Sequence, residues 1–113
     1  MKFFQIEEFD CQHTGNNRMD PEFLERIDAL RLMCNFPFVI TSGYRDPTHP
    51  IEAAKTKPGT HAQGIACDIK VDTSDKRYTL INNALLMGFS GIGVDSEFIH
   101  LDQRLTTRVM WIY

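Results

Sequence analysis

Residues 61–71 read His-Ala-Gln-Gly-Ile-Ala-Cys-Asp-Ile-Lys-Val. Apolar side chains alternate along the second half of this stretch, at Ile65, Cys67, Ile69 and Val71. A period of two predicts a β-strand over residues 65–71 with one face in the core. Asp68 falls on the opposite face, so the strand would present a carboxylate on the side that points away from the core.

Helical patterns lie on both sides of this strand. Upstream, Asp20 and Pro21 form an N-cap followed by proline at the first helical position, which predicts a helix over residues 21–33. Its apolar face is formed by Phe23, Ile27, Leu30 and Cys34. Downstream, Ser74 is the predicted N-cap of a second helix, which Gly88 would end. The predicted apolar face of this second helix consists of Tyr78, Ile81, Ala84, Leu85 and Gly88.

Three further segments have strand patterns. They are the β-branched run at residues 38–41, a segment at residues 98–101 that follows Gly91-Ile92-Gly93-Val94, and the final residues 109–113. Residues 42–60 contain prolines and glycines without periodicity, which predicts a long functional loop. Since the order is not a regular βαβ alternation, we expect an α+β fold with a small, mostly antiparallel sheet and two main helices. The length of 113 residues predicts one domain over residues 1–113.

Charge and composition argue against several classes of protein. The formal net charge is -3 and no run of Lys or Arg stands out, which disfavours a nucleic-acid partner. Three cysteines without paired spacing do not suggest a disulfide framework. The longest apolar stretch, at residues 36–40, is too short for membrane insertion. Acidic residues from Glu7 onward interrupt any signal-peptide pattern, so we expect synthesis in the cytoplasm, and nothing in the sequence indicates an oligomeric state.

Two histidines and a carboxylate form a candidate metal site. Asp68 and His100 would meet on one face of the sheet if their two predicted strands are neighbours. His61 lies at the mouth of the strand that carries Asp68. Two histidines and one carboxylate are a known set of catalytic zinc ligands that leaves a fourth position for water. The spacing is also consistent with a surface His61, a solvated Asp68 and a hydrogen-bonded His100 in the core.

Three motifs in order resemble those of a known peptidase family. They are Ser42-Gly43-Tyr44-Arg45, His61-Ala62-Gln63-Gly64-Ile65-Ala66-Cys67-Asp68 and Phe98-Ile99-His100-Leu101-Asp102. The arrangement is similar to that of the zinc D-alanyl-D-alanine carboxypeptidase family, which includes D-Ala-D-Ala dipeptidases and the L-alanyl-D-glutamate endopeptidases of bacteriophage lysins. The resemblance implies that His61, Asp68 and His100 bind zinc (Zn2+) for the hydrolysis of peptide bonds.

The resemblance also implies catalytic roles for two residues beside the metal. A carboxylate at or near Glu97 would act as the base that takes a proton from water, with Asp95 as the alternative. A regular strand places Glu97 and His100 on opposite faces, so this role requires a turn or bulge at the entry of the strand. Arg45 would stabilise the developing oxyanion or hold a substrate carboxylate. Glu97 and Arg45 could instead be solvated surface groups.

Three residues near the C-terminus have two interpretations each. Asp102 either hydrogen-bonds a ligand histidine or is a plain surface aspartate. Trp111 and Tyr113 either stack on a sugar or close the core, and we favour the core.

The expected substrate, from the resemblance, is the D-amino-acid-containing stem peptide of bacterial peptidoglycan. The resemblance does not distinguish a carboxypeptidase from a dipeptidase or an endopeptidase. The expected setting is a phage-type lysin that acts on the cell wall after lysis or from a virion. The alternative function is a catalytically silent module that keeps zinc and binds peptidoglycan or a protein. Whether Glu97 reaches the metal site distinguishes the two.

Overall fold

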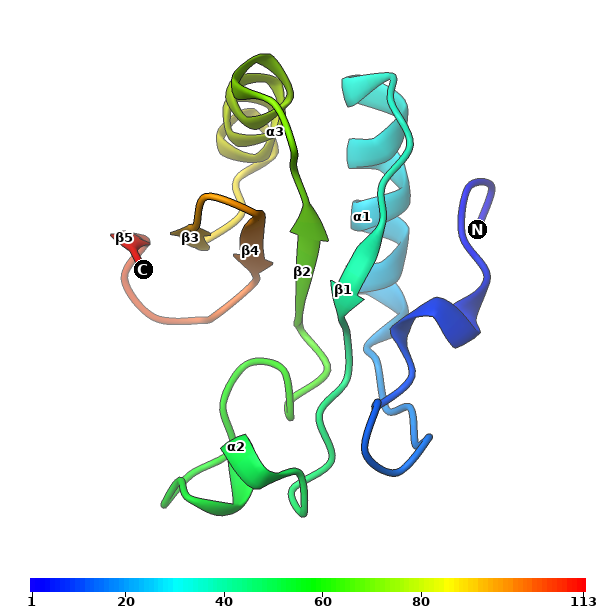
Figure 1. Cartoon of the computed structure of the whole chain (residues 1–113), viewed down its shortest axis with the longest axis vertical. Helices are drawn as coiled ribbons and strands as arrows, with labels where there is room; N and C mark the ends of the chain where they lie inside the picture. Colours follow the sequence, from blue (N-terminus) through cyan, green and yellow to red (C-terminus); the bar gives the residue numbers. More distant parts are fainter.

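The computed structural model describes all 113 residues, which are arranged in two layers (Figure 1). Helices α1 (Pro21–Cys34) and α3 (Ser74–Met87) pack on one face of a five-stranded sheet. Two short helical segments, η1 (Ile6–Phe9) and α2 (Pro50–Ala53), lie in the connections. No helix combines the length and the apolar character needed to span a membrane. The strands are β1 (Ile40–Ser42), β2 (Ala66–Lys70), β3 (Gly91–Val94), β4 (Phe98–Asp102) and β5 (Val109–Ile112).

The sheet has the strand order β1-β2-β4-β3-β5. Strand β4 pairs antiparallel with β2 and β3, and β1 pairs antiparallel with β2, whereas β5 runs parallel to β3. The α+β prediction is therefore confirmed, but the sheet is mixed and not the mostly antiparallel sheet that we expected. The parallel pair arises because the loop at residues 103–108 crosses the start of β3, where Gly91 pairs with Asp102 on one side and Val109 on the other.

Helix α1 begins and ends where the sequence predicts, to within one residue. The Asp20 carboxylate accepts a hydrogen bond from the amide of Phe23 (3.3 Å), and Pro21 occupies the first turn. Asn35 ends the helix in the left-handed conformation, with φ 57°.

Helix α3 has a different N-cap from the predicted one. Thr73, and not Ser74, caps the helix, because the Thr73 hydroxyl accepts a hydrogen bond from the amide of Lys76 (3.4 Å). Gly88 ends the helix as predicted, in the left-handed conformation with φ 83°.

The buried face of α3 also differs from the predicted one. Its buried side chains are Leu80 and Ala84, whereas Tyr78 and Leu85 of the predicted face are exposed. The helix has apolar residues on two adjoining stripes, and only one stripe can face α1 and the sheet.

The core lies between the helices and one face of the sheet. Strands β2 and β4 contribute four side chains with no exposed surface to this core, namely Cys67, Ile69, Ile99 and Leu101. Since side chains alternate along a strand, the residues between these four project from the face that no main helix covers. The buried polar residues of β2 and β4 on this helix-free face are Asp68, His100 and Asp102, and Lys70 at the end of β2 is exposed on the same face.

Candidate metal centre

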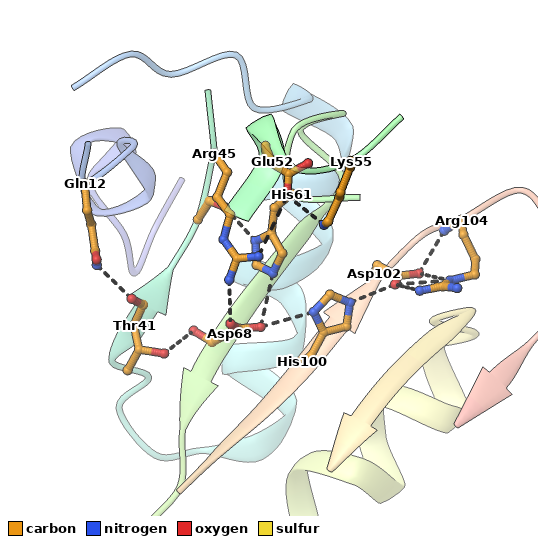
Figure 2. A network of polar contacts seen from close by, with 11 residues as sticks. Gln12, Thr41, Arg45, Glu52, Lys55, His61, Asp68, His100, Asp102 and Arg104 are labelled. Carbon is orange, nitrogen blue, oxygen red and sulfur yellow. Dashed lines mark hydrogen bonds and ion pairs between the residues drawn. The ribbon is translucent and has the colours of Figure 1, made fainter. Parts of the chain in front are cut away.

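Three side chains meet on the helix-free face of the sheet (Figure 2). Asp68 on β2 pairs in register with His100 on β4, and His61 comes from the turn before β2. The Asp68 Oδ1 atom lies 3.3 Å from His61 Nε2 and 3.1 Å from His100 Nδ1. One nitrogen or oxygen of each residue lies within 4.8 Å of those of the other two, and all three residues are buried. The interpretation of His61 and Asp68 as solvated surface groups is therefore wrong.

The turn that carries His61 depends on Gly64. This residue has φ 76°, a conformation that favours glycine, and an added Cβ would collide with the carbonyl oxygen of Arg18. The Gly64 carbonyl accepts a hydrogen bond from the amide of Asp20 (2.9 Å). The turn is thereby attached to the N-terminus of α1, which fixes where the His61 side chain begins.

Each histidine makes a hydrogen bond through the ring nitrogen that does not face Asp68. His61 Nδ1 lies 2.8 Å from the carbonyl oxygen of Gly43, so this nitrogen must be the one that donates a proton. The lone pair of His61 Nε2 then faces Asp68. His100 Nε2 lies 2.8 Å from Asp102 Oδ2, so Asp102 has the first of its two predicted roles, the hydrogen bond to a histidine of the cluster.

Arg104 holds Asp102 from the far side (Figure 2). Its Nε donates to Asp102 Oδ1 at 3.0 Å and its Nη2 donates to Asp102 Oδ2 at 2.6 Å. The Asp102 side chain has no exposed surface, so its charge is compensated only within the protein, by His100 and Arg104.

The charges of the cluster shift one another's pKa values. Burial would raise the pKa of Asp68, but its contacts with His100 and His61 hold it well below its usual range. Burial would lower the pKa of His100, but hydrogen bonds to Asp102 and Asp68 raise it above its usual value. Without a metal, the cluster therefore favours a proton on His100, between two ionised carboxylates.

The donor set fits zinc. Two imidazole nitrogens and one carboxylate oxygen are a zinc ligand set that leaves a coordination position for water. The hydrogen bond to Gly43 fixes the His61 tautomer in which Nε2 is free to bind a metal. A divalent cation would also neutralise the excess of negative charge that now favours the extra proton on His100.

The cluster lies at the base of an open cleft with a volume of about 750 Å³. The cationic residues that line the cleft are Arg45, Lys55 and Arg104. The aromatic residues that line it are Phe98, Trp111 and Tyr113. Asp68 is the only carboxylate among the lining residues. The cleft would therefore favour a ligand that carries negative charge and apolar groups.

Arg45 lies in the cleft, as its motif predicts. Its guanidinium lies between two carboxylates, with Nη2 at 3.8 Å from Asp68 Oδ2 and Nη1 at 4.0 Å from Glu52 Oε2. Glu52 was not predicted. It lies on α2, within the segment predicted to be loop, and its side chain is 1% exposed. Only the Pro50 that opens a helical turn beside this residue hinted at an ordered position.

Glu52 connects Arg45 to the long loop. It accepts hydrogen bonds from the Lys55 ammonium (2.8 Å) and from the amide of Gly59 (2.9 Å). Burial would raise the pKa of Glu52, but these two hydrogen bonds hold it below its usual value. The charge of Glu52 therefore stabilises the fold above the unfolded-state pKa, and this stabilisation is lost as the pH falls through the lower folded-state pKa.

We expect Glu52→Gln to lower the free energy of unfolding by about 1–3 kcal/mol, because it removes charged hydrogen bonds at a buried position. The loss should be full at neutral pH and should shrink as the pH falls towards about 3. Urea unfolding of both proteins across this pH range measures the difference. Glu7→Gln, at an exposed carboxylate, is the control and should change stability little. A deficit that does not depend on pH would contradict the role of the charge.

The structure does not bring Glu97 to the metal centre. Glu97 is exposed on a bend before β4, and it does not line the cleft. Its amide donates to Asp95 Oδ2 (2.9 Å) and its carbonyl accepts from the amide of Val71 (2.9 Å). The register between β2 and β4 is regular, so no bulge turns Glu97 onto the face of His100. Asp95, the alternative base, does not line the cleft either.

We expect Glu97→Gln to change the turnover of a stem peptide by no more than about twofold, the usual range for a surface substitution. Steady-state kinetics of the zinc-loaded variant, with Asp95→Asn in parallel, measures this. A loss of about a hundredfold in the Glu97 variant alone would show that the residue moves to the metal centre and acts as the base.

Trp111 lies in the cleft and not in the core, so our preferred interpretation of this residue is wrong. Its ring centre lies 5.0 Å from that of His100, and the Arg104 guanidinium lies 5.0 Å over its ring. A Cβ on Gly93 would lie 2.7 Å from Trp111 Cε2, so the indole lies directly on the Gly93 backbone. Tyr113, which is 60% exposed, also lines the cleft. Trp111 projects from β5 and Tyr113 directly follows this strand, on the helix-free face, where no second layer covers them.

A buried pair of histidines and a carboxylate that open to a cleft is the ligand set typical of metal-dependent hydrolases. A family model described as Peptidase M15 matches residues 2–102. The chain therefore belongs to the peptidase M15 family and is a zinc-dependent metallopeptidase. A search of curated proteins finds no match. The family match ends at Asp102, so the loop at residues 103–108 and β5 lie outside it.

Proposed function

We propose that residues 1–113 act as a single zinc peptidase domain that hydrolyses peptidoglycan stem peptides. His61, Asp68 and His100 would hold the zinc ion. The observation that carries this proposal is the buried cluster of these three residues, in which both histidines are oriented by a second hydrogen bond. The peptidase M15 match supports peptide-bond hydrolysis, and the resemblance to peptidoglycan peptidases supports the substrate.

Some side chains of the cleft would bind the substrate, and others orient a proposed metal ligand. When bound, zinc supplies a Lewis acid and lowers the pKa of water towards ~7, which reduces the need for a strong base. Arg45, beside Asp68, is placed to bind the carbonyl oxygen or a carboxylate of the substrate. Asp102 and Arg104 fix the ring plane of His100. Lys55 adds positive charge at the cleft wall, which favours the acidic groups of a stem peptide.

We further propose that the protein acts on the cell wall, released by phage-type lysis or carried on a virion. The test of the function is digestion of purified peptidoglycan by the zinc-loaded protein, with mass spectrometry of the products. Release of a terminal D-alanine would identify a carboxypeptidase, a released dipeptide a dipeptidase, and cleavage between L-Ala and D-Glu an endopeptidase. A zinc-loaded protein that releases no product from any stem peptide would contradict the proposal.

One observation favours a second candidate function. No carboxylate other than Asp68 lines the cleft, so no dedicated general base stands beside the metal ligands. A zinc-containing module that binds peptidoglycan without cutting it would need none. Co-sedimentation with insoluble peptidoglycan, together with no released product, would identify this module.

A further inference from the structure

A second cavity lies across the loop at residues 103–108 from the metal-site cleft. It has a volume of about 620 Å³ and is bordered by the first turn of α1, the end of α3 and the residues before β5. The two cavities share part of their walls, namely Gln63, Arg104, Leu105 and Thr106. The two cavities therefore adjoin at this loop.

Most of the charged side chains along these walls already have a partner within the chain. Arg45 and Lys55 pair with Glu52, and Arg104 pairs with Asp102. In the second cavity, Arg26 donates to the carbonyl of Met87 and lies 4.7 Å over the ring of Phe89, and Asp20 caps α1.

Two charged side chains of the second cavity have no such partner. Glu22 is in the first turn of α1, and Arg108 lies just before β5, beside Gly88 at the end of α3. Both residues are exposed, and neither takes part in a hydrogen bond or an ion pair through its side chain. Since the two charges are opposite, the second cavity offers one site for an anion and one for a cation.

We propose that the second cavity binds a further residue of the substrate peptide, one that carries both a carboxylate and an ammonium group. Arg108 binds the carboxylate, and Glu22 binds the ammonium. The inference rests on the proposed peptidase function and deepens it, because it makes the substrate an extended peptide and not an isolated dipeptide. The loop at residues 103–108, which lies outside the family match, then contributes to substrate selection.

The test uses the zinc-loaded protein and three synthetic stem peptides that differ in one residue beyond the scissile bond. This residue has a free carboxylate and amine, an amidated carboxylate, or an acetylated amine. We expect each cap to raise KM for the native protein by about fivefold, the upper scale of an exposed ion pair, with kcat unchanged. Arg108→Gln should lose the sensitivity to amidation and keep the sensitivity to acetylation. Glu22→Gln should show the reverse.

This crossover separates ligand binding from a general effect on the fold, which would not distinguish the two caps. Arg18→Gln, at an exposed arginine that lines neither cavity, is the control for net charge and should behave as the native protein. Equal KM values for all three peptides, or loss of both sensitivities in each variant, would overturn the inference while leaving the peptidase intact. If no peptide is cleaved, the peptidase proposal fails. The inference is then tested by calorimetry of the three peptides: it stands if Kd shows the same opposite sensitivities to the two caps in the Arg108 and Glu22 variants, and it fails if Kd does not.

Discussion

The double variant His61→Ala/His100→Ala should purify without zinc, whereas the native chain should carry one zinc ion per molecule. Two of the three donor side chains are removed, and a lone Asp68 carboxylate cannot hold zinc. Hydrolysis of stem peptides should be lost with the metal. The variant also leaves Asp68 and Asp102 buried without their histidine partners, which should cost about 3–5 kcal/mol of stability. Elemental mass spectrometry of the dialysed proteins measures the zinc content.

Two further variants keep this test independent of folding. His61→Gln retains a donor for the Gly43 carbonyl, so it should stay folded by circular dichroism and still lose zinc. His13→Ala removes an exposed histidine outside the cluster and should keep one zinc ion per chain. Stoichiometric zinc in the folded double variant would show that the ion binds elsewhere.

Replacement of Arg45 by alanine should lower kcat/KM while the zinc content stays at the native level. The loss should correspond to about 2–4 kcal/mol of transition-state stabilisation. The guanidinium lies beside Asp68 without being one of the three proposed ligands, so its loss should affect substrate and not metal. Arg45→Lys should recover only part of the loss, because an ammonium cannot reproduce the planar, two-pronged contact of a guanidinium. Steady-state kinetics on one stem peptide measures all three proteins.

Lys55→Ala provides the matched comparison for Arg45. It removes another cation from the same cleft, but one that pairs with Glu52 and has no ion pair with Asp68. We expect a smaller loss in kcat/KM than in the Arg45 variant. Equal losses in the two variants would mean that Arg45 acts through the overall charge of the cleft. An unchanged kcat/KM in Arg45→Ala would remove its role entirely.

The meeting of Asp68 and His100 could be predicted because it depends on local rules. Alternation along a strand decides which face a side chain takes, and the two predicted strands needed only to be neighbours. The observed register brings the two residues together directly. The boundaries of α1 follow from the same kind of local information, the cap at Asp20 and the proline after it.

Other features could not be predicted because they depend on contacts between distant segments. A role for Glu97 as the base required a bulge before β4. The local sequence does not distinguish such a bulge from the observed structure, in which an exposed Glu97 precedes a regular strand. Glu52 lies in a segment without periodicity, and its burial comes from Lys55 and Gly59 folding around it. Alternation gives the face of Trp111, but not that this face lacks a second layer of helices. The parallel pairing of β5 depends on the path of the loop at residues 103–108 across β3.

The hydrogen bond between His61 and Gly43 has a consequence for how proteins of this design can diversify. Gly43 and His61 stand at the two ends of the long loop, and a second bond joins the Arg45 amide to the His61 carbonyl (3.3 Å). These two hydrogen bonds close the loop at its base, independently of the contacts that its middle residues make. Doubling the length of such a closed loop costs only about 0.6 kcal/mol of entropy. Residues 56–57, between the Glu52 partners Lys55 and Gly59, can thus accept insertions that reshape the cleft wall, while the metal-binding nitrogen of His61 keeps its position.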